Sequence, residues 1–148
     1  MSNPIESPRA EEAVRRLLSI HRHLRQTAKQ VSSELGISGR ELSALRFLHE
    51  AGPRSVGQIR ARLYLADSTT SELLDGLVAK GLVTRARSTS DNRVAMVALE
   101  PPGAALVARA PLAGISLLRH RLRSEPQEKV ERLGEALEYL AGLVGIEE

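Results

Sequence analysis

The sequence contains no cysteine and no tryptophan, and its only aromatic side chains are Phe47, Tyr64 and Tyr139. Without cysteine the chain can form neither a disulfide, nor a thiol redox sensor, nor a cysteine-ligated zinc site. So few aromatic rings also argue against binding to single-stranded nucleic acid, because that binding relies on bases that stack on aromatic side chains. These absences exclude several classes of regulatory protein.

Sequence features of enzymes, metalloproteins and membrane proteins are missing as well. The histidines form neither H-x-x-x-H nor H-E-x-x-H, and no Ser/His/Asp set, glycine-rich phosphate loop or paired-carboxylate motif stands out. No run of about 18 apolar residues could span a membrane, and the start, MSNPIESPRAEEAVRR, lacks the apolar core of a signal peptide. We expect a cytoplasmic protein with no metal, no cofactor, no membrane partner and no enzymatic activity.

The chain is basic overall, and arginine supplies almost all of its positively charged side chains. Its 148 residues fit one domain, and 42% hydrophobic with 26% charged residues is typical of a globular chain. The net charge is +3, and the only lysines are Lys29, Lys80 and Lys129. Arginine binds phosphates and guanine edges through two parallel hydrogen bonds, which lysine cannot do. The positions of the arginines therefore matter more than the net charge.

Apolar residues recur at helical spacing near both ends of the chain. One seam predicts a long helix over residues 10–35 that Gly36 ends; it contains Val14, Leu17, His21, Leu24, Ala28, Val31 and Leu35. The other follows Pro126 and contains Val130, Leu133, Leu137, Leu140 and Val144. Either seam could pack within one chain. Because both lie away from the middle of the sequence, we expect them to join two copies in a homodimer.

Start and stop signals divide the middle of the chain into short helices. Ser38 and Glu41 form a capping box that opens a second helix, which Gly52 and Pro53 end. Ser55 caps a third helix that ends near residue 64. A fourth helix begins at residue 66 or 67, with the side chain of Asp67 as a candidate N-cap, and ends at Gly81.

A β-hairpin is predicted after the fourth helix, over residues 82–99. A fifth helix over residues 103–123 should kink or break at Pro111. The short link between the third and fourth helices has the length of a helix-turn-helix, and the hairpin adds a wing. The predicted fold is mostly α with a small β-hairpin wing. We expect N- and C-terminal dimerisation helices in residues 1–37 and 101–148, around a winged lobe in residues 38–100.

The charge of the chain is concentrated on this predicted lobe. Residues 54–93 contain seven basic and four acidic residues, so their net charge of +3 equals that of the whole chain. The helix at 66–80 begins with small hydroxyl side chains on its outward face, and the 82–99 wing carries arginines. Such a helix can enter a major groove, and an arginine at a wing tip can reach the adjacent minor groove.

Several segments of this region match a known pattern. They are ELSAL at 41–45, SVGQI at 55–59, STTS at 68–71, LLDGL at 73–77 and KGLV at 80–83, followed by DNR at 91–93 and VAL at 97–99. Residues 38–103 therefore resemble the MarR (multiple antibiotic resistance regulator) family of bacterial transcription factors. The combination of K-G-L-V with D-x-R in a wing carries this resemblance, because a helix-turn-helix alone is less specific.

The resemblance implies a homodimer that binds double-stranded DNA at a pseudo-palindrome. It implies the fourth helix in the major groove and Arg93 in the minor groove, with Asp91 steadying nearby basic residues. The candidate DNA-binding residues are Ser68, Thr69, Ser71, Glu72, Arg85, Arg87, Asp91 and Arg93. For the small hydroxyl residues, helix capping and solvation are equally good explanations, and Arg93 could simply be solvated.

The resemblance also implies a repressor that responds to a small-molecule effector. In the family an aromatic or anionic compound is expected between the dimerisation helices and the winged lobe. The candidate lining residues are His21, Arg25, Arg46 and Phe47. Peroxide sensing through a thiol is excluded because the chain has no cysteine.

Three positions depart from the family pattern. Asp67 and Glu72 stand where the family often has basic residues, and Glu100 replaces a common threonine or serine. Carboxylates near a reading face repel phosphates, although Glu72 could accept a hydrogen bond from a cytosine amino group or pair with an arginine. The alternative function is a winged-helix protein-interaction module without a specific DNA target. The two acids favour this alternative and the basic wing disfavours it.

Overall fold

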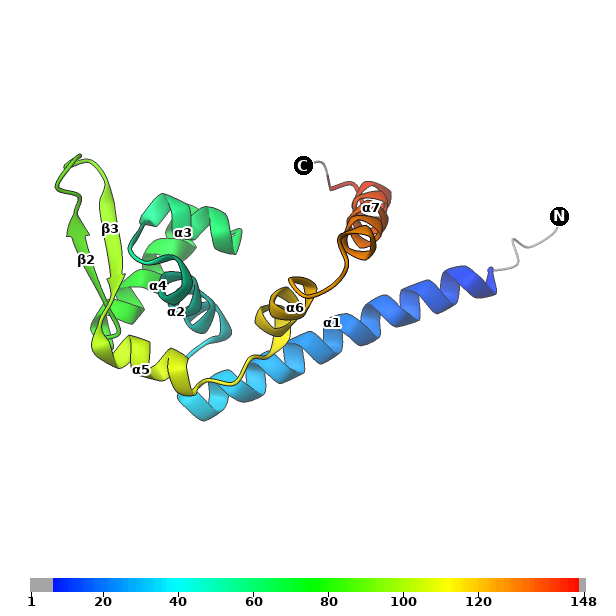
Figure 1. The fold of residues 1–148 in the computed structure, drawn as a ribbon, viewed down its shortest axis with the longest axis horizontal. Helices are drawn as coiled ribbons and strands as arrows, with labels where there is room; N and C mark the ends of the chain where they lie inside the picture. Colours follow the sequence, from blue (N-terminus) through cyan, green and yellow to red (C-terminus); the bar gives the residue numbers. More distant parts are fainter. Residues whose placement is uncertain (1–6, 147–148) are drawn as a thin grey trace. The chain divides into compact units, whose positions relative to one another are not determined.

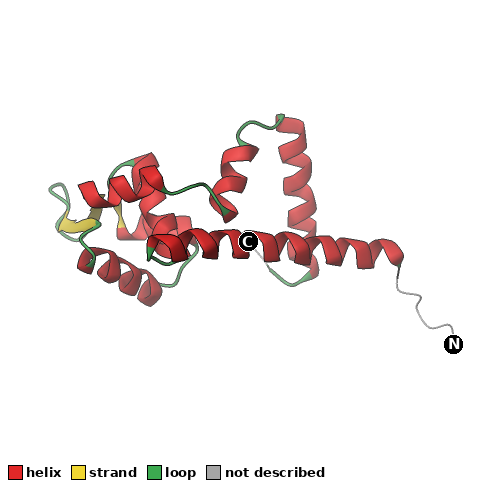
Figure 2. Ribbon diagram, turned by 90° about the horizontal axis from the view of Figure 1, so that it is seen from below, coloured by secondary structure: helices red, strands yellow, loops and turns green. Residues whose placement is uncertain are grey.

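A computed structural model describes residues 7–146 of the chain (Figure 1). Its elements are α1 (Pro8–Leu35), α2 (Gly39–Ala51), β1 (Arg54–Ser55), α3 (Val56–Leu63), α4 (Asp67–Ala79), β2 (Val83–Arg87), β3 (Ala95–Leu99), α5 (Pro101–Arg109), α6 (Gly114–Leu122) and α7 (Gln127–Leu143). Helices with one small antiparallel sheet confirm the predicted fold class (Figure 2).

Two compact units make up the chain, one reaching to Gly114 and the other starting at Ile115. The domain bounds expected from the sequence, at 1–37, 38–100 and 101–148, stay a prediction. Their outermost parts, residues 1–6 and 147–148, lie outside the described residues. No single helix in the described range is long and apolar enough to cross a membrane, although α5 and α6 reach the required length and composition when they are counted together across the break between them.

The predicted capping box opens α2, and a second capping box opens α3, where only the Ser55 cap was predicted. At α2 the Ser38 hydroxyl accepts from the Glu41 N–H at 3.1 Å, and the Glu41 carboxylate accepts from the Ser38 N–H at 2.9 Å. At α3 the same reciprocal pair joins Ser55 and Gln58 at 3.1 and 2.9 Å. Each box satisfies donors that a helix start leaves unpaired, so these two helix starts are fixed locally by the sequence.

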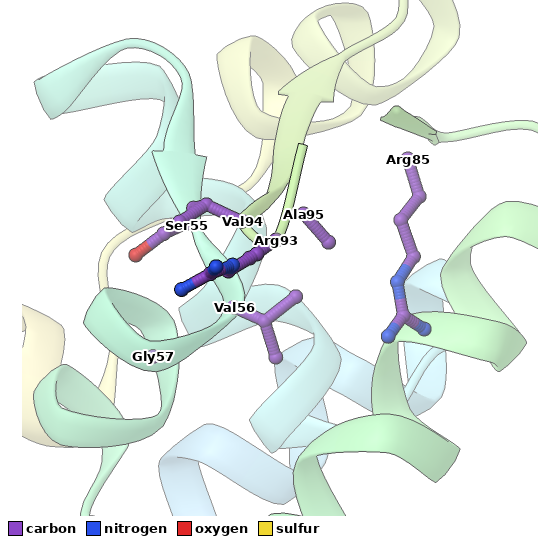
Figure 3. Close-up of a pocket in the computed structure, with 7 residues that line it drawn as sticks. All are labelled: Ser55, Val56, Gly57, Arg85, Arg93, Val94 and Ala95. Atoms are coloured by element: carbon purple, nitrogen blue, oxygen red, sulfur yellow. The ribbon is translucent and has the colours of Figure 1, made fainter. Parts of the chain in front are cut away.

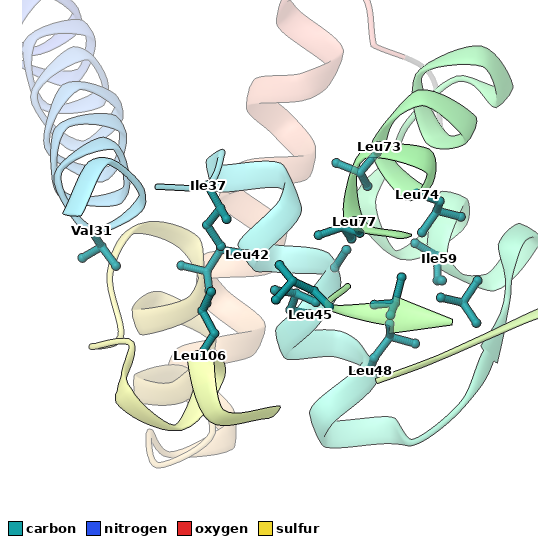
Figure 4. Close-up of a cluster of buried hydrophobic side chains, with 14 residues drawn as sticks. Val31, Ile37, Leu42, Leu45, Leu48, Ile59, Leu73, Leu74, Leu77 and Leu106 are labelled. Carbon is teal, nitrogen blue, oxygen red and sulfur yellow. The ribbon is translucent and has the colours of Figure 1, made fainter. Parts of the chain in front are cut away.

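The hydrophobic core lies where α2, α3, α4 and the sheet meet (Figure 4). Leu45 of α2, Ile59 of α3 and Leu74 of α4 are completely buried there. On α4 the buried residues Thr70, Leu73, Leu74 and Leu77 share one face, as a period of 3.6 residues requires. The opposite face of α4 is therefore left to the solvent.

The predicted hairpin is confirmed, and a further short strand joins it. β2 and β3 pair antiparallel from Val83 opposite Leu99 to Arg87 opposite Ala95. β1 pairs with the other edge of β3, so the strand order is β1-β3-β2. β1 was not predicted, because a strand of two residues shows no alternation of apolar and polar residues. Its pairing brings the start of α3 beside the wing.

The break expected at Pro111 within residues 103–123 is confirmed, and only the start of the helix differs from the prediction. The chain forms α5 from Pro101, breaks after Arg109, and resumes as α6 at Gly114. Proline is tolerated at the first helical position, so α5 starts earlier than expected, and the missing N–H of Pro111 explains the break. Gly103 lets α5 lie directly against the carbonyl of Leu82, with which a side chain at residue 103 would collide.

The apolar seam of α1 divides into two parts. Val31 is buried in the core, and Ala28 lies beside Gly114, whose N–H donates to the Thr27 hydroxyl at 3.2 Å. Nearer the N-terminus, Val14 and Leu17 are 50% and 43% exposed. Among the described residues, it is therefore the C-terminal part of this seam that is buried.

An ion pair joins the start of α2 to the end of α4. The Lys80 ammonium lies 2.8 and 3.0 Å from the two carboxylate oxygens of Glu41, which is 8% exposed. Gly76 leaves room for this carboxylate, since a Cβ there would lie 3.2 Å from one of its oxygens. Burial alone would raise the pKa of Glu41, but the hydrogen bonds from Lys80 and Ser38 and the charge of Lys80 outweigh it and lower that pKa below its ordinary value.

We expect Glu41→Ala to lower the free energy of unfolding by about 1–3 kcal/mol, because it removes both the ion pair and one half of the capping box. Glu41→Gln, which keeps the capping geometry, should cost less. Urea denaturation of both variants measures this, with Ser38→Ala as the control that removes only the cap. Equal losses for Glu41→Ala and Ser38→Ala would show that Lys80 contributes nothing.

The contribution of Glu41 to the free energy of unfolding should depend on pH. Because the pKa of Glu41 is lowered by folding, its contribution is complete above the ordinary carboxyl pKa of 4.5 and is lost as the pH falls through the lower folded value. The difference in unfolding free energy between the wild type and Glu41→Gln should therefore shrink when the pH drops below 4.5. A difference that stays constant from neutral to acidic pH would contradict the assigned role.

Candidate nucleic-acid interface

α3 and α4 form the two helices of a helix-turn-helix, as the sequence predicts. α3 ends at Tyr64, which adopts the left-handed conformation with φ of 54° and ψ of 47°. Its N–H still bonds the last turn of α3, and the side chain is 89% exposed. This conformation is unfavourable for a residue with a side chain, and it allows the chain to reverse between the helices in only a few residues.

Asp67 does not cap α4, contrary to the prediction. The N-cap position is Ala66, whose side chain cannot accept a hydrogen bond, and Asp67 is the first residue of the helix. The Asp67 carboxylate instead lies 3.0 Å from the Arg60 guanidinium on α3. The carboxylate still lies in the first turn, where it is favourable to the helix dipole, and its charge is paired across the turn.

The predicted reading residues of α4 differ in exposure. Ser68 and Glu72 are exposed, and Thr69 and Ser71 are half-buried. Thr70 is completely buried and donates its hydroxyl hydrogen to the Ala66 carbonyl at 2.9 Å. A surface of small polar residues around Glu72 is therefore available at the start of α4.

The wing arginines make three different contacts. Arg85 on β2 lies 3.2 Å from the Asp75 carboxylate on α4, which ties the wing to that helix. Arg87 donates to the Asn92 carbonyl at 2.9 Å, across the tip of the hairpin. The Asp91 carboxylate accepts from the backbone N–H of Arg93 at 2.9 Å. Asp91 thus fixes the turn from which the exposed Arg93 side chain extends.

Arg93 and Arg85 also line an open pocket of about 350 Å³ between the wing and the start of α3 (Figure 3). The other lining residues are Ser55, Val56, Gly57, Val94 and Ala95. The Arg93 guanidinium and the positive end of the α3 dipole make this pocket attractive to an anion such as a phosphate group, whereas the Arg85 guanidinium is already paired with Asp75. From its sequence position Ser55 was predicted only to cap α3, because it is the pairing of β1 with β3 that brings this residue to the wing.

The four predicted effector residues fall into two groups. His21 and Arg25 are exposed on α1, one turn apart. Arg46 is buried on α2 and donates to the Pro111 carbonyl at 2.6 Å, and the ring of the neighbouring Phe47 lies 5.3 Å from the Arg62 guanidinium. Burial lowers the pKa of Arg46, although the charge of Glu50 offsets part of this. Arg46 therefore positions the segment that links α5 to α6. Its role in binding an effector stays a prediction.

Comparison with known proteins gives one consistent result. Residues 35–93 match the sequence model of the MarR family. The uncharacterized HTH-type transcriptional regulator YsmB of Bacillus subtilis (strain 168) is 26% identical over 120 residues, which cover 81% of this chain and 80% of that protein.

Two solved structures share the fold. The transcriptional regulator BldR of Sulfolobus solfataricus aligns with a TM-score of 0.60 at 27% identity, over 89% of this chain and 96% of that one. A mutant of E. coli MarR in complex with operator DNA aligns with a TM-score of 0.64 at 22% identity, over 85% of this chain and 91% of that one. Together with the helix-turn-helix and the wing, these similarities show that the chain has the winged-helix fold of MarR-type proteins and that its residues 35–93 are similar in sequence to the MarR family.

Proposed function

We propose that this protein is a DNA-binding transcription regulator of the MarR family, and that it is a homodimeric repressor that binds a pseudo-palindromic operator and releases it when a small molecule binds. The observation that carries the proposal is the exposed polar face of α4 beside a wing whose arginines remain accessible. Residues 54–93 carry all of the net charge of the chain, and positive charge on one face is the electrostatic signature of DNA binding. The DNA of a bacterium lies in its cytoplasm, so we expect a protein that binds this DNA to be cytoplasmic.

In this proposal α4 enters the major groove and the wing lies over the adjacent backbone. Ser68, Thr69 and Ser71 donate to base edges or phosphates, as small hydroxyl side chains at a helix start can do. Arg93 extends from the turn that Asp91 fixes and reaches the minor groove, whose negative potential attracts arginine. Arg85 is already held by Asp75, so it supports the position of the wing and adds positive charge near the phosphates.

The exposed apolar residues of the terminal helices support the homodimer. Val14, Leu17, Leu18 and Ile20 of α1 are between 43% and 56% exposed, and Leu137, Leu143 and Val144 at the end of α7 are between 52% and 66% exposed. Large apolar side chains at seam spacing favour burial against another helix. In a two-fold dimer the two copies of α4 would meet half-sites about 10 bp apart, which is one turn of DNA.

An effector would act by preferring one arrangement of the two lobes over another. His21 and Arg25 are accessible to an anionic compound, whereas Arg46 would have to leave the Pro111 carbonyl to reach it. The alternative, a protein-interaction module, draws its support from the acids on α4. The pairing of Asp67 with Arg60 weakens that support, because the Asp67 charge is partly neutralised.

Selection of bound fragments from the organism's own genomic DNA at about 150 mM salt tests the proposal, since weak phosphate-only binding is strongly reduced at that concentration. We expect enrichment of a palindrome whose half-sites lie about 10 bp apart. Binding without an enriched motif that disappears as the salt concentration rises would instead support the interaction module.

Replacement of Arg93 by alanine should weaken operator binding and reduce the slope of log affinity against log salt by about one for each wing. Fluorescence titrations over a range of salt concentrations measure both effects. Arg109→Ala is the matched control, because it removes an exposed arginine from α5. If Arg93→Ala binds the operator as tightly as the wild type, then the wing arginine has no role in recognition.

Introduction of a charge on the α7 seam should dissociate the dimer. We expect the wild type to sediment at twice the 16.1 kDa chain mass, and Leu137→Glu to sediment as a monomer because the charge would be buried in the interface. Arg132→Glu, on another side of the same helix, should remain dimeric. Sedimentation velocity at micromolar concentrations distinguishes the two results, and a dimeric Leu137→Glu would exclude this face from the interface.

A further inference from the structure

The acidic residues of the winged lobe are almost all engaged with neighbouring groups. Asp67 lies 3.0 Å from Arg60, and Asp75 lies 3.2 Å from Arg85. Asp91 accepts the N–H of Arg93 at 2.9 Å. Glu72 and Glu100 are the exceptions, because neither side chain makes a hydrogen bond or ion pair within the described part of the chain, and only Glu72 lies on α4. Each of the three aspartates thus has a structural role, and Glu72 has none.

Glu72 lies in the middle of the exposed face of α4. Ser68 lies one turn before it and Asp75 nearly one turn after it, which places all three on one side of the helix. Thr70, Leu73 and Leu74 are buried on the opposite side. The Glu72 carboxylate therefore projects from the part of the helix that would lie deepest in a major groove.

An unpaired carboxylate at this position repels DNA unless it meets a hydrogen-bond donor. The phosphates repel it, and so do the acceptor atoms O6 and N7 of guanine and O4 of thymine. The major groove offers donors only at the amino groups of cytosine and adenine, and adenine presents its N7 acceptor beside its amino group. Cytosine is the base whose major-groove edge best suits a carboxylate.

We propose that Glu72 is a specificity-determining residue that accepts a hydrogen bond from the N4 amino group of a cytosine in each half-site. The inference rests on the proposed DNA-binding function, and it identifies one base pair that the operator contains. It also gives the carboxylate a second effect. On DNA without a cytosine at that position its charge remains unpaired, so Glu72 lowers affinity for unrelated sequences as well as favouring the operator.

Glu72→Gln tests the inference without changing the size of the side chain. The variant and the wild type are each used to select bound duplexes from a randomised library at about 150 mM salt, a concentration that suppresses phosphate-only binding. They are then titrated against operators with each of the four bases at every position. Asp75→Asn is the matched control, because it removes a carboxylate from the same face but one that is paired with Arg85. Thermal unfolding of both variants confirms that they fold.

We expect the wild type to prefer C·G at one symmetric position of each half-site, and Glu72→Gln to reduce this preference about tenfold or more at that position alone. A glutamine can also favour adenine there, since it can donate to N7. Asp75→Asn should change affinity for all sequences by a similar factor and leave the base preferences unchanged.

Two results would overturn the inference, and they are distinguishable. If the wild type selects a palindrome and Glu72→Gln selects the same one, or binds every sequence more tightly by one common factor, then Glu72 only repels phosphates and the proposed function stands. If the wild type selects no palindrome, the proposed function fails and the role of Glu72 fails with it.

Discussion

The arrangement of the winged lobe depends on the carboxylate of Glu41. This one group closes the capping box at the start of α2 and accepts the Lys80 ammonium just after the end of α4. The residues between these two ends build most of the core, so the ion pair fixes where α4 lies relative to α2. The glycine at position 76 is required for the same reason, since a side chain there would crowd the carboxylate. Because α4 is held at its C-terminal end in this way, its first turns, which we propose to read DNA, have one defined orientation.

Arginines from adjacent elements position the remaining parts of the lobe. Arg60 of α3 holds the first residue of α4, and Arg85 of β2 holds the middle of that helix through Asp75. These pairs are partly exposed, so each contributes little to stability. Their effect is to orient side chains and to neutralise acids that would otherwise repel DNA. The lobe can therefore carry acids on its reading helix and still present a basic surface from the wing.

Features encoded by neighbouring residues could be predicted from the sequence, and features that depend on distant residues could not. The capping box of α2, the Ser55 cap of α3, the glycine that ends α1 and the hairpin follow from residues a few positions apart, and all were predicted correctly. β1 could not be predicted, because its two residues form a strand only against β3. The pairing of Asp67 with Arg60 was missed for a similar reason, since a helix start with aspartate usually indicates a cap. The start of the fifth helix was wrong because the sequence contains several glycines and prolines that could begin it, and packing against Leu82 selects among them.

The division of the α1 seam links the proposed dimer to the proposed response to an effector. The C-terminal part of α1 is attached to its own lobe through Val31 and through the bond from Gly114 to Thr27. The N-terminal part exposes Val14 and Leu17, which in the proposed dimer would contact the partner. An α-helix is stiff over this length, so a shift at the dimer interface would be transmitted along α1 to the lobe rather than absorbed in a loop. His21 and Arg25 lie between the two parts. In the proposed dimer, a compound bound there would act on the segment that would set the distance between the two copies of α4, and that distance would have to match the spacing of the half-sites for both copies to bind.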